Sequence, residues 1–147
     1  MTDLEYLHLA YLEAIKAYQQ EEVPIGALIV KDNKIISSAF NTTIKTNNPL
    51  KHAEINCLNL AYSKEKTYNL KGYKIYISLE PCLMCLGALI NSNIKEIYFS
   101  TLNKDEGAFS KYLINPENYN IKIHYLPLKE SESILSDFFQ KIRTKKL

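Results

Sequence analysis

Tryptophan is absent from the 147-residue sequence, and cysteine and glycine are scarce, with three and four residues respectively. So few cysteines cannot build a disulfide framework, which favours a reducing compartment, and we expect a cytoplasmic protein. No apolar run approaches the length of a membrane span, and the amino terminus lacks the basic and apolar regions of a secretory signal, so we expect no membrane partner. The formal net charge of +2 is too small to indicate a nucleic-acid partner unless the charges cluster.

A hydrophobic content of 46% suits one domain with a substantial core, and we predict a single domain over residues 1–147. Thr2 and Glu5 form a capping-box pattern, which predicts a helix that ends near Gln20. Its expected apolar stripe consists of Leu4, Leu7, Tyr11, Ala14, Ile15 and Tyr18. Strand-like runs at 27–30 and 34–40 are joined by Asp32-Asn33, which predicts a hairpin.

The rest of the chain alternates helical and strand-like patterns. We expect a helix at 52–64, a strand at 74–79, a helix at 82–90, a strand at 94–99, an irregular segment at 101–120 and a strand at 121–125. A final helix has an apolar stripe of Ile134, Leu135, Phe138, Phe139 and Ile142 and a basic end of Lys141, Arg143, Lys145 and Lys146. A strand, helix and strand within 74–99 imply a right-handed parallel crossover.

Two short motifs carry side chains that suit a metal. They are His52-Ala53-Glu54 and Pro81-Cys82-Leu83-Met84-Cys85. One imidazole and two thiolates give three ligands for a tetrahedral zinc and leave a fourth position for water, as in catalytic sites. Glu54 is then a candidate proton carrier. H-x-E followed by P-C-x-x-C is the signature of zinc-dependent nucleobase deaminases.

The spacing within each motif constrains where it can lie. Cys82 and Cys85 are three residues apart, so both sulfurs can project from one face of a helix that Pro81 opens. His52 and Glu54 are two apart and would diverge inside a helix, so they can share a pocket only near a helix start. The cysteines should follow the carboxyl end of a strand, where α/β sheets hold ligands.

Other functions for these residues stay open. A structural zinc site would need a fourth ligand from Cys57, His8 or His124, although Cys57 also suits a small buried apolar position. The pair Phe138-Phe139 should place at least one ring in the core. The basic end of the last helix could simply complement the helix dipole.

Along nearly its whole length the sequence resembles bacterial tRNA-specific adenosine deaminases of the cytidine-deaminase-like superfamily. Four stretches carry the resemblance: Glu22-Val23-Pro24-Ile25-Gly26-Ala27, His52-Ala53-Glu54-Ile55, Leu79 to Ala88, and Leu135-Ser136-Asp137-Phe138-Phe139. The resemblance implies an α/β fold with three layers, in which helices cover both faces of a five-stranded mixed sheet. It also implies a zinc-dependent homodimer that converts the wobble adenosine of an arginine tRNA to inosine.

Carried over by position, the resemblance makes His52, Cys82 and Cys85 the zinc ligands and Glu54 the proton carrier. Asn41 would hydrogen-bond the purine or its sugar, although an Asn can also simply end a strand. The residues that match the walls of the base pocket and the RNA contacts are Val23, Pro24, Ile25, Ala53, Leu79, Phe139 and Arg143. Where the family commonly has Asp, this chain has Asn103, which can donate as well as accept and so should change a ribose contact.

Two other functions fit the same motifs. A deaminase of free bases or nucleosides, such as guanine or cytosine, would keep the zinc site and its mechanism. A zinc-stabilised RNA-binding scaffold would bind tRNA without releasing ammonia. The deamination of a short anticodon stem-loop, compared with free adenosine, guanine and cytidine, separates these possibilities.

Overall fold

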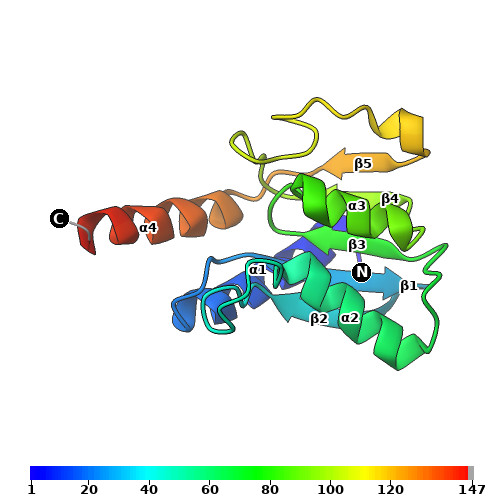
Figure 1. The fold of residues 1–147 in the computed structure, drawn as a ribbon, viewed down its shortest axis with the longest axis horizontal. Helices are drawn as coiled ribbons and strands as arrows, with labels where there is room; N and C mark the ends of the chain where they lie inside the picture. Colours follow the sequence, from blue (N-terminus) through cyan, green and yellow to red (C-terminus); the bar gives the residue numbers. More distant parts are fainter. Residues whose placement is uncertain (146–147) are drawn as a thin grey trace.

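A mixed sheet of five strands forms the middle layer of the structure, a computed structural model that describes residues 1–145 (Figure 1). Lys146, which the sequence analysis assigns to the basic end, lies outside the described residues. In chain order the elements are α1 (Asp3–Gln19), β1 (Gly26–Lys31), β2 (Lys34–Phe40), α2 (Ala53–Glu65), β3 (Lys74–Ile77), α3 (Leu83–Asn91), β4 (Glu96–Phe99), a 3-10 helix (Pro116–Tyr119), β5 (Lys122–Tyr125) and α4 (Lys129–Lys145).

The strand order in the sheet is β2-β1-β3-β4-β5. β1 pairs antiparallel with both β2 and β3, whereas the pairs β3–β4 and β4–β5 are parallel. The predicted hairpin is confirmed, and Asp32 and Asn33 adopt the positive φ angles, 51° and 60°, that tight hairpin turns require. The parallel crossover through α3 is confirmed as well.

Helices cover both faces of the sheet, so the predicted three-layer fold is confirmed (Figure 1). Successive strand residues point to opposite faces, and β1 shows the consequence. Leu28 and Val30 pack with the buried side of α1, while Ala27 and Ile29 belong to the larger core under α2 and α3. α1 begins with the expected capping box of Thr2 and Glu5.

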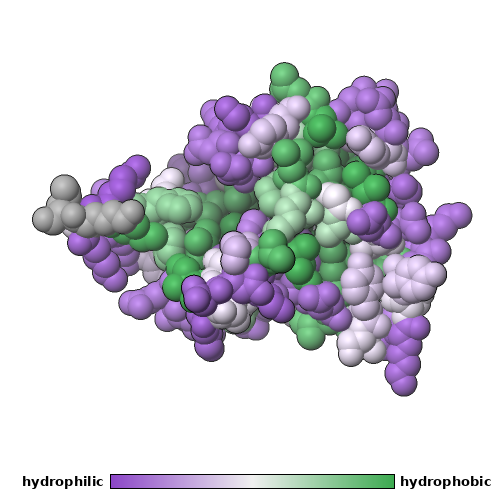
Figure 2. Space-filling view, viewed as in Figure 1, coloured by the Kyte–Doolittle hydropathy of each residue, from purple (hydrophilic) through white to green (hydrophobic). Residues whose placement is uncertain are grey.

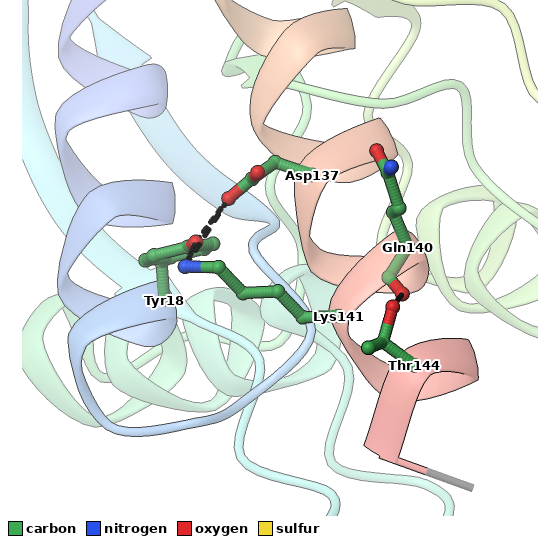
Figure 3. A network of polar contacts seen from close by, with 5 residues as sticks. All are labelled: Tyr18, Asp137, Gln140, Lys141 and Thr144. Atoms are coloured by element: carbon green, nitrogen blue, oxygen red, sulfur yellow. Dashed lines mark hydrogen bonds and ion pairs between the residues drawn. The ribbon is translucent and has the colours of Figure 1, made fainter. Parts of the chain in front are cut away.

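The last helix, α4, extends away from the sheet and is held mainly against α1 (Figure 1). Phe138 is 7% exposed and packs edge-on against Tyr18, with ring centroids 6.4 Å apart. Beside this contact Tyr18 donates a hydrogen bond to Asp137 and accepts one from Lys141 (Figure 3). Because these polar groups are exposed, we attribute most of the attachment of α4 to the buried ring.

Both expected helical stripes need correction. In α1 the buried residues are Tyr6, Leu7, Ala10, Glu13, Ala14 and Ala17, whereas the expected Leu4 is 48% exposed. In α4 Leu135 and Phe138 are buried, but Phe139 is 46% exposed. The segment 101–120, expected to be irregular, contains a 3-10 helix. Within residues 1–145 no helix has the length and apolar content needed to cross a membrane.

Candidate active site

The two metal-binding motifs meet at one edge of the sheet. β2 and β3 both end at this edge and β1 begins there, because β1 runs antiparallel to both. α2 starts here with His52 as its N-cap, and α3 starts here with Cys82 as its N-cap. Both helix N-termini therefore face one site, where their dipoles favour thiolates and carboxylates.

His52, Cys82 and Cys85 come together as the sequence predicts. Their ligand atoms all lie within 4.8 Å of one another. The Nδ1 atom of His52 is 3.7 Å from the sulfur of Cys82 and 3.5 Å from that of Cys85. With usual zinc bond lengths, a nitrogen and a sulfur ligand of a tetrahedral zinc lie about 3.6 Å apart. The donor set thus fits zinc in both chemistry and spacing.

The protonation of the two cysteines is shared between them. A hydrogen bond from the Cys85 thiol lowers the pKa of Cys82 to about 4, and the same interaction raises the pKa of Cys85. Hydrogen bonding to Cys82 also raises the pKa of His52. A divalent cation would take the place of the shared proton, because metal ions bind the thiolate form.

Glu54 lies in the first turn of α2, two residues beyond His52, and is 3% exposed. Burial raises its carboxyl pKa to about 7. A carboxyl group that titrates near neutral pH can both accept and return a proton. Glu54 is not among the clustered donor residues, which suits a proton carrier better than a ligand.

None of the alternative zinc ligands joins the donor group in the described part of the chain. Cys57 is fully buried and lies 3.2 Å from the Ser37 hydroxyl, and burial raises its pKa to about 12. His8 is exposed on α1, and the ring of His124 on β5 stacks on Tyr98 at 4.3 Å. A fourth protein donor, which a structural zinc site requires, is therefore missing from residues 1–145.

Most residues predicted to wall the base pocket lie at the same edge of the sheet. Val23, Pro24 and Ile25 precede β1, and Ala53 is the buried first residue of α2. Asn41 follows β2, is 3% exposed, and donates its backbone N–H to the carbonyl oxygen of Ile25 at 3.1 Å. The structure therefore groups these five residues near the donor cluster.

The other four predicted contacts line a separate groove of about 840 Å³ between α4 and the loop after β4. They are Leu79, Asn103, Phe139 and Arg143. The clustered residues His52, Cys82 and Cys85 do not line this groove, although Leu79 is three residues before Cys82. Asn103 uses its side-chain oxygen to accept the N–H of Glu106 at 3.1 Å.

Sequence reasoning assigned no role to Glu22 or Glu80, although both lie inside motifs that it used. Each is only 1% exposed and binds backbone N–H groups of a loop beside the site. A glutamate directly next to residues expected to wall a pocket was the available signal. The loop groups that bind the two glutamates are 22 to 30 residues away from them in sequence, so only the fold reveals these contacts.

The donor cluster with a buried glutamate, at the edge of a helix-covered mixed sheet, defines the class of zinc-dependent nucleobase deaminases. In agreement, the family model of MafB19-like deaminases matches residues 1–143. The tRNA-specific adenosine deaminase of Aquifex aeolicus is 40% identical over 142 residues, covering 94% of each chain. That of Bacillus subtilis is 32% identical over 146 residues, covering 96% of this chain and 91% of its own.

Solved structures of deaminases share the fold. A structure from studies of A-to-I editing by tRNA:A34 deaminases superposes with a TM-score of 0.79 at 30% identity, covering 90% of this chain and 99% of its own. The guanine deaminase of Bacillus subtilis superposes with a TM-score of 0.69 at 28% identity, covering 98% and 95%. The chain belongs to the deaminase family and, within it, to the tRNA-specific adenosine deaminases. The expected family and enzyme class are confirmed.

Proposed function

We propose that the protein is a zinc-dependent hydrolytic deaminase that converts the wobble adenosine, position 34, of an arginine tRNA to inosine and releases ammonia. One observation carries the proposal: His52, Cys82 and Cys85 cluster within 4.8 Å beside the buried Glu54. The relatives named as tRNA-specific adenosine deaminases cover almost the whole chain and support the choice of substrate.

The proposed chemistry assigns one role to the metal and the rest to the chain. Zinc held by the three donors would supply a nucleophile at neutral pH, because zinc lowers the pKa of water from about 15.7 to about 7. Glu54 takes a proton from the attacking water and delivers it to N1 of the purine. Glu54 then takes the remaining proton from the new hydroxyl group on C6 and passes it to the departing amine, so that the C6–N bond breaks and inosine and ammonia result.

We propose that the base enters between the apolar walls and Asn41. The Asn41 side chain donates through Nδ2 to the Thr43 hydroxyl at 3.3 Å, and among residues 1–145 its Oδ1 accepts no hydrogen bond. That oxygen remains available for the base or the sugar. A wobble base must be splayed out of the anticodon loop to reach such a pocket, as is usual in RNA recognition.

The groove along α4 suits the flanking RNA. Phe139 is 46% exposed there and can stack on a base. Arg143 also lines the groove and forms no salt bridge with a carboxylate of the described chain. Lys141 and Lys145, by contrast, lie 3.4 Å from Asp137 and 3.9 Å from Glu21. Among the described cations of the basic end, Arg143 is therefore the one that we assign to phosphate.

We further propose that the chain acts as a cytoplasmic homodimer of single deaminase domains. One family model covers residues 1–143, which supports a single domain. Figure 2 shows apolar surface over α2 and α3. On these helices, Leu60 of α2 is 52% exposed and Leu83 of α3 is 43% exposed. Exposed apolar patches mark interaction sites, and a second copy would cover this one.

The competing function is deamination of free bases, because the chain is also similar to the guanine deaminase of Bacillus subtilis. The test incubates the purified zinc-loaded protein separately with an arginine tRNA transcript, its anticodon stem-loop, adenosine, guanine and cytidine. We expect inosine in both RNAs and no ammonia from the small substrates. Ammonia from guanine or cytidine, without inosine in the RNA, would establish the competing function. RNA binding without ammonia would indicate a scaffold.

A further inference from the structure

Two buried carboxylates outside the proposed catalytic set directly precede residues of the active site in the sequence. Glu22 precedes the pocket segment 23–25, and Glu80 precedes Pro81 and Cys82. Each is 1% exposed, and neither forms a salt bridge within residues 1–145. A buried carboxylate is costly unless hydrogen bonds satisfy it, so the groups that supply those bonds indicate what each glutamate does.

Glu80 accepts hydrogen bonds from the loop that follows β4. Its Oε1 accepts the backbone N–H of Asn103 at 3.1 Å and the Ser110 hydroxyl at 2.5 Å. Its Oε2 accepts the backbone N–H groups of Phe109 and Ser110 at 2.9 and 2.8 Å. One side chain therefore ties both ends of the segment 103–110, and this segment carries the proposed contact Asn103.

The same segment passes so close to Glu80 that only glycine fits at position 107. A Cβ atom there would lie 2.3 Å from Glu80 Oε2 and 2.3 Å from the carbonyl oxygen of Asn103. The N–H of Gly107 donates to that carbonyl oxygen at 2.8 Å. The backbone of this segment and the Glu80 carboxylate are therefore closely packed, which restricts the movement of Asn103.

Glu22 holds the loop that follows β2 in a similar way. Its Oε1 accepts the backbone N–H of Ile44 at 2.9 Å and its Oε2 that of Lys45 at 2.6 Å. The N–H of Thr42 closes the loop by donating to the carbonyl oxygen of Lys51 at 3.0 Å. This loop begins at Asn41, the proposed contact to the base.

We propose that Glu22 and Glu80 are positioning residues that fix the two loops bearing the substrate contacts Asn41 and Asn103. The inference rests on the proposed function and extends it to substrate placement. Neither glutamate touches the substrate; each acts through the backbone of its loop. A misplacement of about 1 Å can lower a rate about 100-fold. The positions of these two loops therefore control the turnover rate and the affinity for the substrate.

The test replaces each carboxylate by the amide of nearly equal size. In Glu22→Gln and Glu80→Gln an NH₂ group that cannot accept a hydrogen bond faces backbone donors, so each loop loses part of its attachment. Glu13→Gln is the matched control, because Glu13 is also buried, at 8% exposure, but its partner is the Lys16 side chain on the same helix. Ser110→Ala removes a single donor to Glu80 at an exposed residue and is expected to fold normally.

The measurements are kcat and KM on the anticodon stem-loop, zinc content, thermal unfolding and hydrogen–deuterium exchange by peptide. We expect Glu80→Gln to raise KM about tenfold with kcat nearly unchanged, and Glu22→Gln to lower kcat about tenfold, both with full zinc. Ser110→Ala should raise KM about twofold, in the range of one hydrogen bond's small net contribution. Faster exchange should be confined to 101–112 in the Glu80 variant and to 41–50 in the Glu22 variant.

Kinetic constants equal to those of Glu13→Gln would overturn the inference. So would exchange that rises throughout the sheet, because that pattern indicates a general role in stability. If the wild-type protein forms no inosine, the proposed function fails, but the exchange measurement still decides whether the two carboxylates hold their loops. The two failures can therefore be distinguished.

Discussion

Replacement of Gly107 by alanine tests the packing of the loop after β4 most severely. The new Cβ atom would lie 2.3 Å from two oxygen atoms, Glu80 Oε2 and the carbonyl oxygen of Asn103, and real Cβ atoms essentially never come closer than 3.0 Å. Neither oxygen can retreat easily, because Glu80 accepts four hydrogen bonds. The loop must open and release some of them.

Hydrogen bonds to a charged group contribute about 1.5–3 kcal/mol each. If two of the four are lost, we expect Gly107→Ala to lower the free energy of unfolding by about 3–6 kcal/mol. In a chain of this size that corresponds to a fall in Tm of about 10–20 °C. Urea unfolding and thermal melting of the zinc-loaded protein measure both quantities.

Gly87 in α3 provides the matched control, since a Cβ there meets nothing within 4 Å. Alanine inside a helix is favoured over glycine by about 0.5–1 kcal/mol, so Gly87→Ala should be slightly stabilising. A Gly107→Ala variant that unfolds within about 0.5 kcal/mol of wild type would refute the close packing of Glu80 against this loop.

Further predictions concern the thiols, the metal and the RNA contact. With zinc bound, a thiol reagent should modify no cysteine. After chelation at pH 7 it should modify Cys82, because the pKa of this thiol is about 4. It should spare Cys57, because a pKa of about 12 leaves only about one part in 10⁵ of this thiol as thiolate. Mass spectrometry locates the label, and early modification of Cys57 would contradict its burial. Metal removal by a chelator should abolish inosine formation, and added zinc should restore it; activity that survives complete removal would exclude a zinc enzyme. Arg143→Ala should weaken tRNA binding and reduce the slope of log K against log salt by about one, and an unchanged slope would remove Arg143 from the phosphate contacts.

Local patterns allowed the sequence to predict most elements of the fold. The capping box of Thr2 and Glu5 depends on residues three apart, and the hairpin at Asp32-Asn33 depends on the turn itself. The clustering of His52, Cys82 and Cys85 could be predicted because the spacing of each motif favours a helix start. Both helices do begin at those positions, with His52 and Cys82 as N-caps.

Features that depend on contacts between distant segments could not be predicted. The pattern in α1 does not reveal that Leu4 stays exposed while Ala10 and Ala17 are buried, because small residues leave a weak periodic signal. In α4 the two adjacent rings look alike in sequence. Only the position of Tyr18 decides that Phe138 is buried and Phe139 faces the groove.

The roles of the buried charges were also beyond the sequence. Glu22, Glu54 and Glu80 all lie next to motif residues, and sequence reasoning selected only Glu54. The partners of Glu22 and Glu80 are loop N–H groups, which every residue except proline possesses. Such partners have no sequence signature, so a fold is needed to identify them.

The central claim is that Glu54 moves protons beside a zinc ion held by His52, Cys82 and Cys85. The most direct test measures zinc content and the single-turnover rate of inosine formation in the arginine anticodon stem-loop for wild type and Glu54→Ala. We predict one zinc per chain in both proteins and a rate at least about 100-fold lower in the variant, within the usual range for general acid–base catalysis. Near-normal turnover by Glu54→Ala, or loss of zinc together with the glutamate, would contradict the claim.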